Sequence, residues 1–198
     1  MRGGGVDGNE RLTAATGAVL IALLAALGLT ILSIQALIWW HFLLGMLLIP
    51  PVLLKLGTTG WRFLRYYRGA PEYVRRGPPL LPLRLMAPLV VAATLAVFAT
   101  GVALLVVGPA GGLLVGLHKA SFIVWFVVTA VHVLAHVRPL PRLVAADWQR
   151  RPLPGERRVP GSAWRLWLLA ATLVAGAVLA TATVHYADPW MHWFGVSH

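Results

Sequence analysis

Four histidines lie inside long apolar runs of the sequence, where an ionisable side chain is costly. His41 lies in one run, and His118, His132 and His136 lie in another. Ionisable residues within a membrane are functional candidates by default. His118 and His132 are 14 residues apart, about 21 Å of helix, so they share one helix face at two depths. This arrangement predicts that the histidines are axial ligands to the iron of a buried b-type haem.

The apolar composition indicates that these histidines are surrounded by lipid. The chain has 198 residues, of which 59% are hydrophobic, and its mean hydropathy is +0.76. A helix needs about 20 apolar residues to cross a bilayer. We therefore predict an all-α membrane bundle of five helices, four of which pack around haem. The predicted spans are 12–33, 36–57, 85–108, 113–137 and 164–184. The first two share one continuous apolar run, so a tight reversal is expected near Ile34 and Gln35.

The distribution of charge predicts the orientation of the chain. The net charge is +11, and Lys119 alone among the 17 lysines and arginines falls on the second face of a five-span topology. Because basic residues accumulate in cytoplasmic loops, residues 1–11 are predicted to be a cytoplasmic tail and residues 185–198 an extracytoplasmic tail. The basic loops would attract anionic lipid headgroups, and we prefer this interpretation to nucleic-acid binding. The first apolar run lacks a cleavage site and is predicted to be a permanent helix of a protein of the inner cell membrane.

Two cytoplasmic connections are expected to differ in structure. Residues 58–84 are aromatic and basic, and their first half is predicted to continue the second helix. Pro79 and Pro82 are then predicted to interrupt helical structure. Residues 138–161 are rich in proline and arginine and are predicted to be irregular. The chain has no cysteine, which excludes disulfides, thiolate-bound clusters and covalent c-type haem attachment.

Topology converts sequence position into membrane depth. His41 lies five residues below the outer edge of the second span, and His118 lies five residues below the outer edge of the fourth. A bis-imidazole haem needs two ligands from opposite sides, each about 2 Å from the metal. We therefore predict His41 and His118 as the haem pair. Gly45 follows His41 by one turn and would let either a flat macrocycle or another helix approach the backbone closely, and Lys119 is placed to neutralise a haem propionate.

The inner half of the fourth span carries His132 and His136, which lack a matching histidine on another predicted helix. The second helix offers Lys55 at that depth. His132 is the next candidate metal ligand, and a second haem is possible there only with a further ligand. Otherwise His132 and His136 would contact haem propionates, transfer protons or line a quinone pocket.

Several other polar and aromatic residues have two interpretations. Trp39 and Trp40 would either donate to a propionate or anchor the chain at the membrane surface. Ser121, Trp125 and Thr129 are spaced four residues apart and would either line the path between the two depths or serve helix packing. The remaining three histidines are expected on the surface; they are His185, His192 and His198.

The motif WWHFLLG around His41 and the segment LHKASFIVWFVVTAVHVLAH together resemble bacterial membrane cytochromes b. These include cytochrome b561-like proteins, cytochrome b subunits of hydrogenases and formate dehydrogenases, and cytochrome b/b6-domain proteins. The resemblance covers about residues 12–138. It implies a membrane subunit that passes electrons between a quinone pool and a partner redox enzyme. Hydrogenase-type subunits carry a histidine near the inner start of the first span, whereas this chain has ERLTAATG there.

The predicted function is electron transfer through b-type haem rather than stand-alone catalysis. The alternative is a non-haem membrane protein, either a transporter-like subunit, an assembly factor or a structural anchor for a partner enzyme. Few acidic or polar residues lie within the spans, which weakens the transporter interpretation. No motif identifies the electron donor or acceptor.

Overall fold

The chain is a multi-pass helical membrane protein. A computed structural model describes residues 5–77, 81–151 and 159–196, and this part of the chain contains helices and no strand. Five of its helices are long and apolar enough to cross a membrane. Such runs become helical because lipid offers no hydrogen bonds, so each segment must satisfy its own backbone. These helices are α1 (Gly5–Ile31), α2 (Ile34–Tyr67), α4 (Leu81–Val107), α5 (Gly112–His136) and α7 (Ser162–Thr183). The shorter ones are α3 (Pro71–Arg76), α6 (Leu140–Trp148), the 3₁₀ turn η1 (Val184–Ala187) and α8 (Asp188–Phe194).

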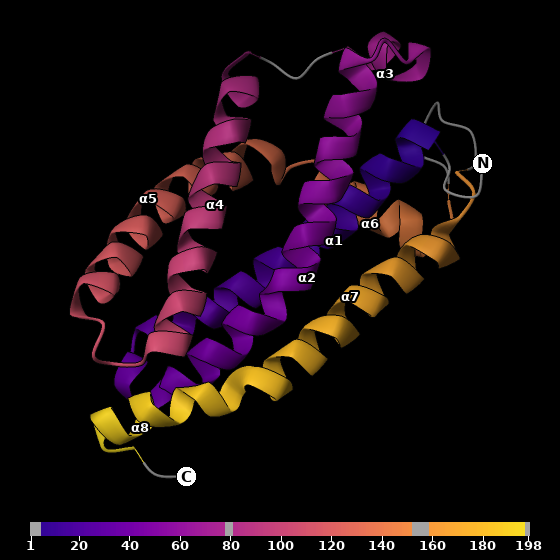
Figure 1. The fold of residues 1–198 in the computed structure, drawn as a ribbon. Helices are drawn as coiled ribbons and strands as arrows, with labels where there is room; N and C mark the ends of the chain where they lie inside the picture. The colour runs from indigo at the N-terminus through magenta and orange to yellow at the C-terminus, as the bar shows by residue number, and fades with distance from the viewer. Residues whose placement is uncertain (1–4, 78–80, 152–158, 197–198) are drawn as a thin grey trace.

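Two antiparallel hairpins, α1–α2 and α4–α5, make up much of the bundle. The first reverses at Leu32 and Ser33, close to the expected position. The second reverses over residues 108–111, where Gly108 adopts a φ of 75° that favours glycine. Both reversals lie at the same end of the molecule as α8 (Figure 1). Each hairpin therefore presents the first turns of its second helix at this end.

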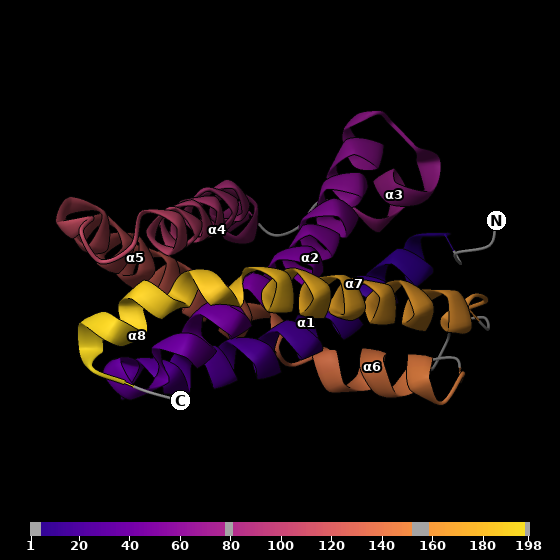
Figure 2. The same cartoon turned by 60° about the horizontal axis from the view of Figure 1, so that its bottom comes forward.

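The third component of the bundle is α7, which packs along α2. Their backbones are in direct contact, because a Cβ at Gly176 would overlap the Leu47 carbonyl oxygen. Small residues permit this kind of close approach between membrane helices. Helix α1 also packs on α2, and the α4–α5 hairpin lies to one side of this group (Figure 2).

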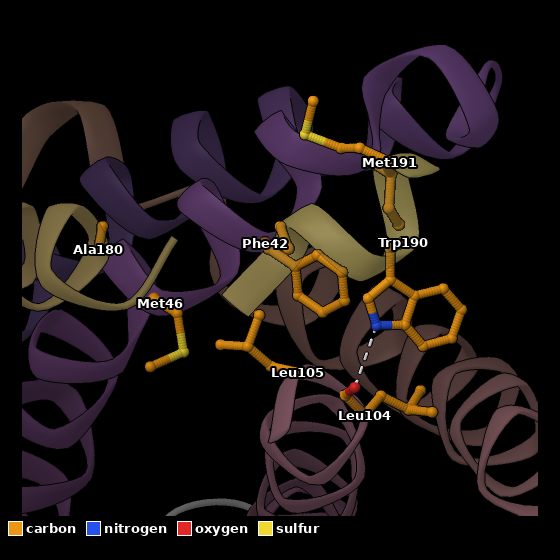
Figure 3. Packing of buried hydrophobic residues seen from close by; sticks show 9 residues of the cluster. Phe42, Met46, Leu104, Leu105, Ala180, Trp190 and Met191 are labelled. Atoms are coloured by element: carbon orange, nitrogen blue, oxygen red, sulfur yellow. Dashed lines mark hydrogen bonds between the residues drawn. The ribbon is translucent and has the colours of Figure 1, made fainter. Parts of the chain in front are cut away.

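Helix α8 joins α2 to α4 through a buried apolar cluster. The indole Nε1 of Trp190 donates to the Leu104 carbonyl at 3.1 Å, and the ring lies 6.0 Å from that of Phe42 (Figure 3). Trp190 and Met191 are both buried. Residues 185–194 of the predicted extracytoplasmic tail form η1 and α8, which pack on the bundle through the buried side chains of Ala187, Trp190 and Met191. Residues 197–198 lie outside the described residues.

A buried ion cluster holds the opposite end of the bundle. Asp147 of α6 is 4% exposed and lies between Arg11 of α1 and Arg165 of α7, each 2% exposed. Arg165 donates through Nε to Oδ2 at 3.0 Å and also pairs with Oδ1. The Nη1 atom of Arg11 lies 3.9 Å from Oδ1. Buried charges persist only when they are paired, so this cluster fixes α1, α6 and α7 together.

This cluster also explains two differences from the predicted architecture. Residues 5–11 belong to α1 rather than to a tail, and Arg11 within them is buried in the ion cluster. Within 138–161, residues 140–148 form α6 and carry Asp147 inward. The rest of the tail predicted over 1–11 lies outside the described residues.

Helix α2 is longer than a membrane crossing requires. Its 34 residues span about 51 Å, against a hydrocarbon core of about 30 Å. The predicted continuation of the second helix is confirmed, since α2 ends at Tyr67. It bends near its middle (Figure 1), where it contains Pro50 and Pro51. Pro82 does not interrupt a helix, because it lies in the first turn of α4, where its missing N–H costs nothing.

We expect Asp147→Asn to destabilise the protein by about 3–5 kcal/mol, because two buried arginines lose their counter-charge. Asp7→Asn is the matched control, since Asp7 pairs with Arg76 at 3.1 Å at an exposed site and exposed pairs contribute about 0–1 kcal/mol. Thermal unfolding in detergent, followed by far-ultraviolet circular dichroism, measures both. Equally small effects of the two substitutions would contradict the structural importance of the cluster.

Candidate functional site

His41 is held by a threonine of the preceding helix. Its Nδ1 lies 2.8 Å from Oγ1 of Thr30, near the end of α1. The same hydroxyl donates its single proton to the Leu27 carbonyl at 2.5 Å. When the hydroxyl donates to Leu27, its oxygen is left to accept from the ring, and the imidazole proton is then on Nδ1.

His118 repeats this arrangement in the second hairpin. Its Nδ1 lies 2.9 Å from Oγ1 of Thr100 on α4, and Thr100 donates to the Ala96 carbonyl at 2.8 Å. The Val97 carbonyl is a further acceptor beside the ring. Gly101 leaves space for the imidazole, since a Cβ there would lie 3.2 Å from Cε1 of His118.

The shared hydrogen-bond pattern accommodates one chemical form of both rings, in which each Nδ1 donates to a threonine oxygen. With the proton on Nδ1, each Nε2 keeps its lone pair, which is the form that ligates a metal. Metal-binding histidines almost always donate their other N–H to an oxygen, which fixes the tautomer and the ring orientation. The two threonines supply this support from α1 and α4. Each imidazole in this form keeps one lone pair that is available to a metal.

The structure places the two predicted histidines at comparable positions on two different helices, α2 and α5, although they are separated by 77 residues (118 − 41). His41 is the eighth residue of α2 and His118 the seventh of α5, so they lie at similar distances from the two reversals. A Cβ added at Gly45 would meet nothing within 4 Å, which leaves open space one turn from His41.

The inner end of α5 is arranged differently. His132 and His136 are neighbours on one helix, with ring centroids 4.4 Å apart. Nδ1 of His132 is buried and, among the described residues, has no hydrogen-bond partner. Lys55 is the cationic group of α2 that interacts with His132, as its predicted depth indicated, and it donates to the Thr13 carbonyl at 2.7 Å. No second histidine from another helix meets His132 among the described residues.

The other predicted residues occupy varied environments. Lys119 is exposed on α5, and Trp40 is exposed while its neighbour Trp39 is half-buried. Two of the three residues spaced four apart on α5 contact α4: Ser121 lies 3.2 Å from Thr100, and Trp125 donates to Thr94 at 3.2 Å. These contacts favour the helix-packing interpretation. His185 and His192 are exposed as predicted, and His198 lies outside the described residues.

Sequence reasoning missed Thr30, Thr100 and Gly101. Each lies in an apolar run, where threonine and glycine are also common in helix–helix contacts. A polar residue near the end of one span, followed by a histidine near the start of the next, is the signal that points to such a pair. That signal becomes specific only when the register between the two helices is known.

The comparisons with known proteins leave the family open. No protein-family model matches the chain, and neither the curated proteins nor the solved structures contain a match. Groups of three or more histidine, cysteine, aspartate or glutamate side chains suited to a metal ion are also absent from the described part of the chain.

We expect Thr100→Val to change the tautomer ratio of His118 while leaving that of His41 unchanged. Loss of one net hydrogen bond, about 1 kcal/mol, changes the tautomer ratio about fivefold. Nitrogen-15 NMR of histidine-labelled protein without cofactor measures both rings in one sample, and Thr30→Val is the reciprocal control. A fully Nε2-protonated His118 in the unmodified protein would contradict the assignment.

Proposed function

We propose that this chain is a membrane electron-transfer protein that binds one b-type haem between the α1–α2 and α4–α5 hairpins. His41 and His118 are its axial ligands. The observation that carries the proposal is the matched pair of threonine–histidine hydrogen bonds, which leaves an Nε2 lone pair on each hairpin. The histidine arrangement and the resemblance to membrane cytochromes b support the same function.

His41 and His118 are the residues that would hold the haem, since b-type haem is bound by histidine side chains. This is consistent with the lack of any larger ligand group among the described residues. The open space beside Gly45 and the close approach of the His118 ring to Gly101 provide room at the two ligands. When bound, haem supplies a one-electron couple.

The protein contributes ligand orientation and a low dielectric. Thr30 and Thr100 hold the imidazoles in the ligating tautomer, and their hydrogen bonds at Nδ1 raise ligand basicity. The apolar helices exclude water, which influences the potential of the bound group. Lys119, which is exposed on α5, is proposed to neutralise a propionate.

We propose one haem rather than two. His132 has His136 beside it on the same helix and Lys55 as the interacting group from α2. Two histidines of one helix approach from the same side and do not readily occupy opposite axial positions. His132 and His136 are proposed instead to take part in proton transfer or to line a quinone pocket.

The proposed setting is the inner cell membrane, with the N-terminus in the cytoplasm. The clustering of lysine and arginine in two connections and at the start of α1 supports this orientation. The electron partners proposed here are a quinone pool and a partner redox enzyme, in accord with the resemblance to membrane cytochromes b.

The full chain, purified in detergent from haem-replete cells, is expected to be red. Its reduced-minus-oxidised spectrum should show the α band of b-type haem at one haem per chain. His41→Ala and His118→Ala should each abolish the band, because one axial ligand is lost. His185→Ala is the control, since His185 is exposed on η1, and His132→Ala should retain the haem.

Two results would overturn this function. A colourless protein from haem-replete cells would exclude resident haem and favour a non-haem membrane protein. Loss of the band in His132→Ala alone would exclude His41 and His118 as the ligand pair. In either case the helical content of each variant, measured by circular dichroism, must match that of the unmodified protein.

A further inference from the structure

A second site lies at the opposite end of the bundle from the two hairpin reversals. A cavity of about 420 Å³ is bounded there by residues of α1, α2, α3 and α7, within the usual size range of ligand pockets. Trp61, Tyr73 and Trp164 supply aromatic side chains to its lining from three different helices. Leu12 and Leu168 make part of the lining apolar.

The cavity also contains one cation and one anion. The Cζ atom of Arg65 lies 5.7 Å from the ring centroid of Trp61 and 5.9 Å from that of Tyr73, so its guanidinium is held by two aromatic faces. Glu72 lines the same cavity from the first turn of α3. Within the described residues, neither Arg65 nor Glu72 forms an ion pair. A zwitterionic ligand would supply a counter-charge to each of these groups.

The charges in the cavity select a zwitterion. Guanidinium groups bind phosphate through paired, charge-assisted hydrogen bonds. A carboxylate beside aromatic rings suits an ammonium group, which both attract. Arg165 also lines the cavity, but its guanidinium is engaged by Asp147, so it does not make the site strongly cationic.

The location indicates that this zwitterion is attached to acyl chains. Trp61 and Trp164 are each more than half exposed and are typical of the membrane–water interface. We propose that the cavity binds the headgroup of an ethanolamine phospholipid, with its phosphate on Arg65 and its ammonium on Glu72. The two leucines then contact the first carbons of the lipid.

Native mass spectrometry of the full chain in detergent tests this site with two lipids of identical acyl chains. Phosphatidylethanolamine should be retained about tenfold more than phosphatidylglycerol, which has the phosphate but no ammonium. Arg65→Gln and Glu72→Gln should each lower retention of phosphatidylethanolamine about tenfold, because each loses a hydrogen-bonded charge. Arg68→Gln is the matched control: it makes the same charge change just after α2, where Arg68 is exposed.

Several outcomes would overturn the proposal. Equal retention of the two lipids, or an equal loss in Arg68→Gln, would indicate nonspecific attraction to a basic surface. Displacement of the lipid by an equal concentration of soluble phosphoethanolamine would assign the cavity to a free compound rather than to a lipid. If Arg65→Gln loses helical content, Glu72→Gln decides the question, because Glu72 is exposed. None of these measurements depends on haem.

Discussion

One end of the bundle depends on the ionic interaction between the buried carboxylate of Asp147 and two arginines. It joins α1, α6 and α7, which approach from three separate parts of the sequence. Its counterpart at the other end is Trp190, which ties α8 to the carbonyl of Leu104 and packs near Phe42. The first interaction is ionic and the second is largely apolar. Together they position the two hairpins while leaving α5 in contact mainly with α4.

The candidate site reflects the lack of hydrogen-bonding partners in lipid. A threonine in a membrane helix can donate to its own backbone, and its oxygen then remains available as an acceptor. Thr30 and Thr100 use that capacity on histidines of the following helices. Both hairpins do so near their reversals, so the two rings have the same kind of hydrogen-bond partner at similar positions along their helices.

The sequence was informative wherever composition and depth decide the structure. Apolar runs identified the long helices, and counting from their ends placed His41 and His118 at matching levels. It was uninformative wherever a contact joins distant elements. Asp147 lies in an arginine- and proline-rich stretch that resembles a solvated loop, so its burial depends on Arg11 and Arg165 meeting it. The threonine partners were missed because helix register decides which hydroxyl meets which ring.

The position of α8 has a consequence for the order in which the protein matures. Both histidine-bearing hairpins are translated before α8, yet the contacts of Trp190 with α4 and α2 come from that later segment. These contacts can therefore form only after both hairpins have been translated.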